Sequence, residues 1–247
     1  MTKMDHNAQT GRVFTLPDAN AQATYLADWI LEQALAKKDG FLSIALSGGS
    51  TPQKLYELLG SPAYARKMPW SRIHLFFGDE RMVPPTHEAS NHHMVNKALL
   101  SHIDIPFRNV HPMPTFADAD DAAKIYQREL EIFYGNNQLD AAKPLFDIVF
   151  LGLGNDGHTA SLFPKTPVLQ EKTKWVSWCD PTTVPYRRLT LTYPTLASSR
   201  HVVFVVSGEG KKDILKAVRS GENDYPAAAI STTGELSWVI DKAASSE

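Results

Sequence analysis

Four short apolar runs, each followed by a glycine-containing polar turn, constrain the fold of this chain more than any other feature. The runs cover residues 41–46, 73–77, 146–151 and 201–206, and their length and their β-branched and aromatic content are typical of buried strands. Helical patterns alternate with them, at 17–38 and from Lys211 to about Arg219, and two further short strands are expected at 227–230 and 238–240. This alternation predicts an α/β fold with a Rossmann-like, mostly parallel sheet and helices on both faces.

The length, charge and cysteine content of the chain limit its number of domains, its partners and its cellular location. We expect a single α/β domain over residues 1–247, because no repeat or linker divides the 247 residues. A net charge of −2 argues against a nucleic-acid or polybasic membrane partner. The apolar runs are too short to span a bilayer, and the N-terminus lacks the apolar core of a signal peptide. The lone Cys179 excludes an intramolecular disulfide, so we expect a cytoplasmic protein; the sequence leaves its oligomeric state open.

The glycine-rich segment 151–164 carries the strongest chemical signal. It follows the apolar run 146–151 and contains Asp156 and His158 before a segment that we expect to be helical. Ligands of open α/β sheets bind at the carboxyl ends of the strands, and an imidazole at that position is suited to proton transfer near neutral pH. The alternative is a buried histidine that serves only the structure. Asp156 orients the histidine or points elsewhere.

A second glycine-containing turn, Ser47-Gly48-Gly49-Ser50-Thr51, precedes a proline that suits the first turn of a helix. Its glycines allow the backbone to approach an anion, and its hydroxyls and the free N–H groups of the helix can bind a phosphate. The alternative is a tight strand-to-helix turn with a helix cap. The pattern matches neither a dinucleotide-binding nor a Walker motif, and Ser50 is not placed in a nucleophile elbow.

Charged side chains supply further candidate catalytic and anion-binding residues. Asp79 and Arg81 follow the apolar run 73–77 and can act as a cleft carboxylate and an oxyanion-binding guanidinium, or they can belong to a solvated loop. Arg188 and Lys211 are each weak signals alone, since most such residues lie on the surface. Lys211 begins a helix, where the helix dipole disfavours a cation unless an anion binds nearby.

We expect no metal site. His87 and His92 frame a string that is one residue too long for the H-E-x-x-H motif, and His92 and His93 would point about 100° apart on a helix. The sequence therefore indicates neither a metal nor another cofactor.

Together these motifs resemble the 6-phosphogluconolactonases. The resemblance runs in order through most of the chain, and its motifs are Leu46-Ser-Gly-Gly-Ser50, Phe77-Gly-Asp-Glu-Arg-Met-Val-Pro84, Ser90-Asn91, Gly152-Leu-Gly-Asn-Asp-Gly-His-Thr-Ala-Ser-Leu-Phe-Pro164, Arg188-Leu-Thr-Leu-Thr192 and Gly208-Glu-Gly-Lys211. The glucosamine-6-phosphate deaminase/isomerases are similar in fold, but they follow the Asp-Gly-His loop with Phe-Asn-Glu-Pro. This chain has no carboxylate there.

The resemblance implies a hydrolase of the pentose phosphate pathway that converts 6-phosphogluconolactone to 6-phosphogluconate without a cofactor. In this reaction His158 would be the general base, and the resemblance implies that Asp156 assists it or binds substrate hydroxyls. A cation such as Arg81, or another group, would stabilise the oxyanion. The substrate and its phosphate would be held by the remaining candidates: Ser47, Gly48, Gly49, Ser50, Thr51, Asp79, Asn91, Arg188 and Lys211. The alternatives are a sugar-phosphate isomerase or deaminase and a non-catalytic sugar-phosphate sensor.

Overall fold

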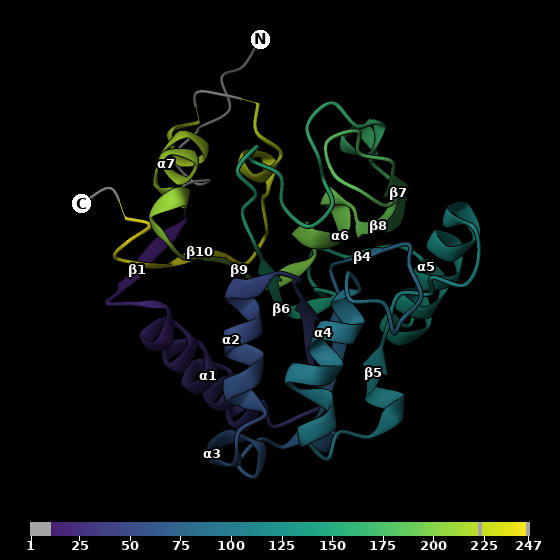
Figure 1. The fold of residues 1–247 in the computed structure, drawn as a ribbon. Helices are drawn as coiled ribbons and strands as arrows, with labels where there is room; N and C mark the ends of the chain where they lie inside the picture. The colour runs from purple at the N-terminus through teal and green to yellow at the C-terminus, as the bar shows by residue number, and fades with distance from the viewer. Residues whose placement is uncertain (1–10, 222–223, 246–247) are drawn as a thin grey trace.

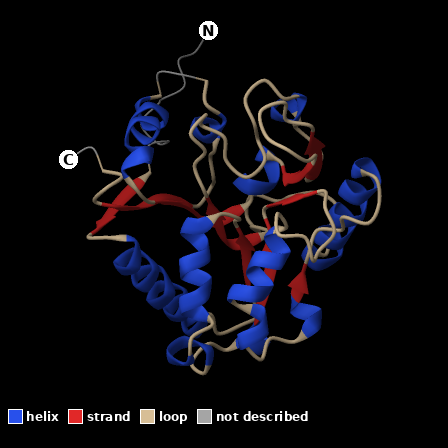
Figure 2. Ribbon diagram, viewed as in Figure 1, coloured by secondary structure: helices blue, strands red, loops and turns tan. Residues whose placement is uncertain are grey.

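A seven-stranded parallel sheet forms the centre of the molecule (Figures 1 and 2). The computed structural model describes residues 11–221 and 224–245. In sheet order the strands are β1 (Arg12–Leu16), β10 (Glu235–Asp241), β9 (Ser199–Val206), β6 (Phe146–Leu151), β2 (Leu42–Leu46), β3 (Ile73–Phe77) and β5 (Val110–His111). Every neighbouring pair in this sheet is parallel, which confirms the predicted α/β class.

Helices connect the strands and pack on the sheet. The α-helices are α1 (Ala19–Ala36), α2 (Ser50–Leu59), α3 (Pro62–Ala65), α4 (Asn91–Ala98), α5 (Ala119–Tyr134), α6 (Tyr193–Ala197) and α7 (Lys212–Ser220). Short 3₁₀ turns are η2 (Trp70–Arg72), η3 (Leu100–His102), η4 (Phe107–Asn109), η5 (Pro167–Gln170), η6 (Glu209–Lys211) and η7 (Pro226–Ala229). The helices predicted at 17–38 and after Lys211 are thus present as α1 and α7.

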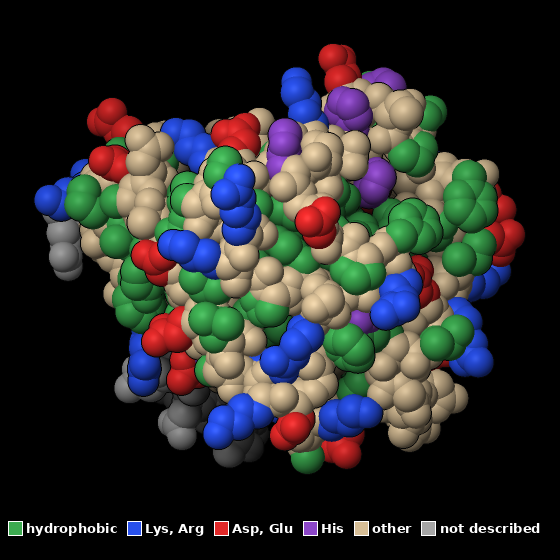
Figure 3. Space-filling view, turned by 90° about the horizontal axis from the view of Figure 1, so that it is seen from below, with side chains coloured by type: hydrophobic (Ala, Val, Ile, Leu, Met, Phe, Trp, Pro, Cys, Tyr) green, Lys and Arg blue, Asp and Glu red, His purple; other side chains and the backbone are tan. Residues whose placement is uncertain are grey.

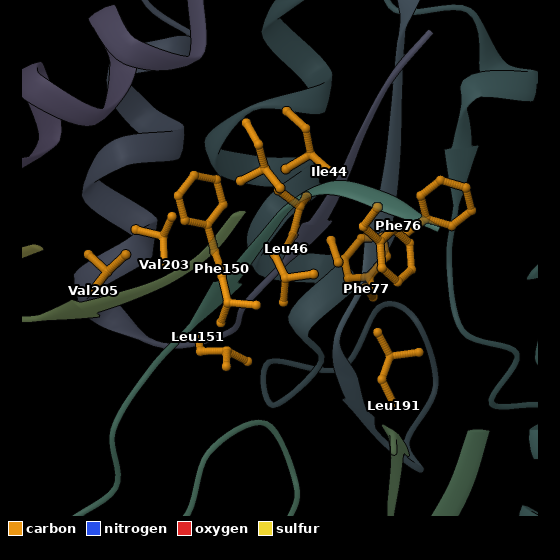
Figure 4. Close-up of a cluster of buried hydrophobic side chains, with 14 of the residues drawn as sticks. Ile44, Leu46, Phe76, Phe77, Phe150, Leu151, Leu191, Val203 and Val205 are labelled. Carbon is orange, nitrogen blue, oxygen red and sulfur yellow. The ribbon is translucent and has the colours of Figure 1, made fainter. Parts of the chain in front are cut away.

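Two adjacent phenylalanines of β3 show that helices cover both faces of the sheet. Consecutive side chains of a strand point to opposite faces. The Phe76 ring lies 4.8 Å from the Phe133 ring of α5, whereas the Phe77 ring lies 5.7 Å from the His92 ring of α4. Figure 4 shows such buried side chains gathered from the central strands: Ile44, Leu46, Phe76, Phe77, Phe150, Leu151, Val203 and Val205, with Leu191 nearby.

A second, antiparallel sheet of β4 (Asp79–Arg81), β8 (Arg188–Leu191) and β7 (Val176–Cys179) was not predicted. Its strands are short, and β4 continues from β3 after a single glycine, Gly78, so that periodicity alone does not separate them. This small sheet brings the 79–81 segment beside the 188–191 segment.

The order of the main sheet fixes where a ligand can bind. From β2 the chain builds outward to β3 and β5, and then returns to β6 and builds in the opposite direction. The reversal leaves a crevice between the carboxyl ends of β2 and β6, which is the usual ligand site of such sheets. The two glycine-rich turns predicted from the sequence follow these two strands.

Two local predictions were wrong. Residues 227–230 are not a strand: Pro226–Ala229 form η7, and the Ala227 N–H donates to the Gly157 carbonyl at 2.9 Å instead of to a sheet neighbour. The segment after His158 is not helical either, because it runs through turns stabilised by tertiary contacts until η5 begins at Pro167. The strand predicted at 238–240 is part of β10.

The surface opposite the loop-bearing end of the sheet has mixed charge. Figure 3, which looks at the molecule from below the view of Figure 1, shows Lys and Arg side chains interspersed with Asp and Glu. The described part of this face therefore shows mixed charge instead of the clustered basic patch of a nucleic-acid footprint. Among the described residues, no helix is long and apolar enough to cross a membrane.

Candidate active site

A cavity of about 310 Å³ lies at the crevice between the carboxyl ends of β2 and β6. All of the predicted site residues except Asp156 line it: Ser47, Gly48, Gly49, Ser50, Thr51, Asp79, Arg81, Asn91, His158, Arg188 and Lys211. The topology thus gathers residues from six separate segments of the sequence into one cavity.

Asp156 lies outside the cavity lining but holds the histidine. Its Oδ1 lies 2.5 Å from Nδ1 of His158 and also accepts the His158 backbone N–H at 3.2 Å. The imidazole stacks on the Phe163 ring, with 4.2 Å between centroids. Since Nδ1 carries the proton donated to Asp156, Nε2 keeps its lone pair, and Nε2 has no hydrogen bond to the described residues. This arrangement suits a general base.

The ionisation of Asp156 supports this tautomer. Burial by itself raises the pKa of the Asp156 carboxyl, but the hydrogen bond and charge of His158 and the backbone N–H groups outweigh burial, so the net pKa lies below the ordinary value. Asp156 is therefore a carboxylate at neutral pH and accepts, rather than donates, the shared proton.

Glycine is required at two positions of this loop. A Cβ on Gly154 would lie 2.1 Å from Nδ1 of His158, so no other residue leaves room for the imidazole. Gly157 has φ +77°, and a Cβ there would lie 2.3 Å from the Tyr225 ring. The glycines therefore allow the sharp turn that brings Asp156 and His158 together.

The turn after β2 forms the wall beside the N-terminus of α2. The buried Tyr56 hydroxyl fixes the turn, since it accepts the Ser47 N–H at 3.0 Å and donates to the Ser47 carbonyl at 2.9 Å. Gly49, with φ +103°, precedes the helix, and no side chain caps the first helical N–H groups. Free N–H groups and the positive end of the helix dipole favour an anion at this wall.

Asn91 and Asp79 form a buried polar contact behind that turn. The Asn91 side-chain amide donates to the Asp79 carbonyl at 2.9 Å and to its carboxylate at 3.2 Å. The Asp79 carboxylate also accepts the Ser161 hydroxyl at 2.6 Å. A Cβ on Gly48 would lie 2.0 Å from the Asn91 side-chain oxygen, so that glycine is needed for the close approach.

Arg188 places a buried guanidinium group in the cavity. Its side chain is 6% exposed, and its Nε and Nη1 atoms are buried without a hydrogen-bond partner. Arg81 lies directly opposite it in the β4–β8 pairing, which places two like charges together. Burial, and then the charge of Arg81, lower the pKa of Arg188. A bound anion would relieve both effects.

Lys211 contributes a further cation to the cavity. Its Nζ donates to the Asn155 side-chain oxygen at 2.6 Å, and burial lowers the pKa of its ammonium group, although the nearby Asp156 opposes this. Arg81 is held by a hydrogen bond from Nη1 to the Ala89 carbonyl at 2.6 Å. The cavity therefore combines several cationic side chains with an imidazole whose Nε2 has no hydrogen bond to the described residues.

Sequence reasoning missed residues that orient these groups. Glu80, 1% exposed, turns away from the cavity and accepts the N–H groups of Arg81 at 2.8 Å and of Asn91 at 2.7 Å, which fixes both residues. Ser161 and Asn155, which contact Asp79 and Lys211, were also not singled out. Their positions within the motif 152–164 were the available signal, because neither residue type is distinctive alone.

The histidines considered as metal ligands do not converge. His87 packs against the Tyr186 ring, whereas His92 packs against Phe77. Within residues 11–221 and 224–245, no group of three or more His, Cys, Asp or Glu side chains is arranged to hold a metal ion.

Comparison with known families matches residues 17–238 to the glucosamine-6-phosphate isomerases/6-phosphogluconolactonase family. This chain belongs to that family. Family members similar to it include the 6-phosphogluconolactonase of Nostoc sp., 41% identical over 95% of this chain and 97% of the relative. The chloroplastic 6-phosphogluconolactonase 3 of Arabidopsis thaliana is 38% identical over 91% of this chain and 70% of the relative.

Solved structures of the glucosamine-6-phosphate isomerase/6-phosphogluconolactonase family share the fold. The 6-phosphogluconolactonase from Trypanosoma brucei has a TM-score of 0.82 and 30% identity, over 95% of this chain and 97% of that one. The Thermotoga maritima enzyme has a TM-score of 0.79 and 30% identity, over 94% and 99%. A monomeric glucosamine-6-phosphate deaminase, 20% identical with a TM-score of 0.76, shares the fold.

Proposed function

We propose that this protein hydrolyses 6-phospho-D-glucono-1,5-lactone to 6-phospho-D-gluconate, as a cytoplasmic enzyme of the oxidative pentose phosphate pathway. The observation that carries the proposal is a histidine with a free Nε2, oriented by a carboxylate, in the same cavity as a buried arginine whose Nε and Nη1 have no hydrogen-bond partner among the described residues. The relatives named 6-phosphogluconolactonase support it.

His158 acts on water in this scheme. Nε2 removes a proton from a water molecule as its oxygen attacks C1 of the lactone. The resulting imidazolium is stabilised by Asp156 and then donates its proton to the ring oxygen as the bond from C1 to that oxygen breaks. The products are a hydroxyl and a carboxylic acid, and the acid releases its proton at neutral pH. A lactone carbonyl is already activated, so the reaction needs no covalent intermediate.

The cationic side chains bind two different negatively charged groups of the substrate. Arg81 stabilises the negative charge that develops on the C1 oxygen. Arg188, Lys211 and the Ser47–Thr51 turn hold the phosphate at the other end of the substrate, so that its binding energy orients C1 for attack. Asp79 and Asn91 complete the wall and face the sugar hydroxyls.

An isomerase or deaminase is the alternative from the same family, and a feature of this chain disfavours it. At the place where those enzymes carry a glutamate for ring opening, this chain has the segment 161–164 without a carboxylate. Ser161 instead donates its hydroxyl hydrogen to the Asp79 carboxylate, so one oxygen of that carboxylate is already occupied by a hydrogen bond. The likeness to the solved deaminase concerns the fold alone.

Acid release on adding fresh 6-phosphogluconolactone, recorded in a pH-stat, tests the proposal. A lactonase releases acid faster than the spontaneous rate, a deaminase releases ammonia from glucosamine 6-phosphate, and a sensor does neither. His158→Ala should lower kcat by roughly 10²–10⁴-fold, the usual contribution of general acid–base catalysis. Wild-type acid release equal to the blank would refute the proposal.

A further inference from the structure

A buried amide on α1 ties together the carboxyl ends of two strands beside the cavity. Gln22 is 2% exposed, and its Nε2 donates to the Val206 carbonyl of β9 at 3.0 Å and to the Val239 carbonyl of β10 at 2.7 Å. Its Oε1 accepts the hydroxyl of Ser207 at 2.5 Å, and Ser207 lines the cavity. Every polar atom of this side chain is therefore used to fix the point where β9 ends.

Asp241, the last residue of β10, fixes the next residue of the same segment. It is 6% exposed, and both of its carboxylate oxygens accept the Gly208 N–H, at 3.0 and 3.1 Å. Oδ1 also accepts the Ala244 N–H at 2.9 Å, which holds the carboxylate in place. Gly208 has φ +95°, a conformation that side chains rarely adopt, so the carboxylate anchors the chain where it turns sharply.

The segment anchored in this way ends at Lys211. The Lys211 N–H donates to the Gly208 carbonyl at 3.0 Å, so the position of Gly208 sets the position of the η6 turn and of the lysine at its end. The side chain of Lys211 extends to the loop that follows β6, where its Nζ donates to the Asn155 side-chain oxygen. Movement of Gly208 would therefore carry the ammonium group away from the cavity while leaving His158 and Asp156, which belong to a different segment, in place.

We propose that Asp241 is a positioning residue that sets the affinity of the site for the phosphate end of its substrate, by holding the Gly208–Lys211 turn. This inference rests on the proposed function, because it takes Lys211 as a phosphate ligand. Asp241 touches no substrate: it acts through the Gly208 N–H. Asp241 therefore affects KM for the phosphorylated substrate and not the rate of the chemical step.

Asp241→Ala tests the inference when phosphorylated and unphosphorylated substrates are compared. Hydrogen bonds to a charged group are lost, so KM for 6-phosphogluconolactone should rise about 10-fold, with kcat within about 3-fold of wild type. The kcat/KM for unphosphorylated glucono-1,5-lactone should change by less than about 3-fold. Asp241→Asn keeps one carbonyl oxygen for Gly208 and Ala244 and should recover part of the affinity, and it serves as the test variant if the alanine protein does not fold.

Asp147→Ala is the matched control. Asp147 is 7% exposed, lies on β6, which β9 separates from β10, and likewise accepts a backbone N–H, that of Ser43 at 2.9 Å. Loss of Asp147 should lower the melting temperature without changing the ratio of the two substrates' kcat/KM values. Equal losses for both substrates in the Asp241 variants, or the same selective loss in Asp147→Ala, would overturn the inference.

Calorimetric titration with 6-phosphogluconate and gluconate separates this inference from the proposed function. If the wild-type protein binds 6-phosphogluconate but does not hydrolyse the lactone, the proposed function fails while the role of Asp241 is still tested by the affinity of its variants. A wild-type affinity for 6-phosphogluconate retained in both Asp241 variants would refute the positioning role.

Discussion

Asp156→Asn tests how His158, the proposed general base, is oriented. The substitution keeps the size of the side chain but removes the charge that holds the proton on Nδ1 of His158. A hydrogen bond to a charged group contributes roughly 1.5–3 kcal/mol. The two side chains are 28% and 40% exposed, so solvent screens the contact and the lower end applies. We therefore expect kcat to fall by about 10–30-fold, since about 1.4 kcal/mol corresponds to a factor of ten.

The assay is acid release from 6-phosphogluconolactone at several substrate concentrations, with spontaneous hydrolysis subtracted at each pH. KM should stay within about 2-fold of wild type, because the loss concerns the chemical step. Asp121→Asn is the control: it removes a carboxylate that pairs with Lys124 on α5, and it should leave both constants unchanged. A kcat within about 3-fold of wild type would refute the orienting role. A rise in KM alone would instead assign Asp156 to binding sugar hydroxyls.

Four further predictions follow from the same geometry. Arg188→Ala should weaken calorimetric binding of 6-phosphogluconate by roughly 2–5 kcal/mol and affect gluconate far less; equal losses would place Arg188 at the lactone end or in folding. Gly48→Ala should displace Asn91 and lower thermal stability by about 1–3 kcal/mol, and an unchanged melting curve would contradict the close approach of that side chain. Activity should survive exhaustive dialysis against a strong chelator, and a loss restored by zinc or magnesium would overturn the proposed water activation. Burial, then the charges of His111 and Arg108, lower the pKa of His74 to about 4, so the unfolded chain binds a proton first as pH falls below about 6.5. The free energy of unfolding should then decrease by about 1–2 kcal/mol between about pH 6.5 and 4, allowing for partial exposure. In His74→Phe, the free energy of unfolding from urea titrations at several pH values should depend less on pH over this range.

The sequence determined the class of fold because the physics of buried parallel strands is local. A strand covered on both faces must be mostly apolar, without the alternation of a half-exposed strand, and this requirement is visible in residues 146–151 and 201–206. The turns that follow such strands necessarily meet at one edge of the sheet. The grouping of His158 with the Ser47–Thr51 turn was therefore predictable without any knowledge of side-chain contacts.

Local patterns failed where tertiary contacts replaced regular hydrogen bonding. Residues 227–230 are as apolar as a short strand, but the Ala227 N–H donates to the Gly157 carbonyl in the loop that follows β6. The loop after His158 likewise departs from a helix, with the Ser161 N–H donating to the Thr190 hydroxyl. Short apolar runs do not distinguish these outcomes, because the competing partner lies far away in the sequence.

Only the tertiary structure decided how the charges of the site are arranged. The pairing of β4 with β8 sets Arg81 opposite Arg188, and Arg188 is a buried residue with two nitrogens unpartnered among the described residues, instead of a surface residue. In the same way, Gln22 and Asp241 look like ordinary polar residues until α1 and β10 pack beside the end of β9. The reason is physical: a residue's identity gives its charge and hydrogen-bonding groups, whereas its exposure and its partners depend on segments that meet only when the chain folds.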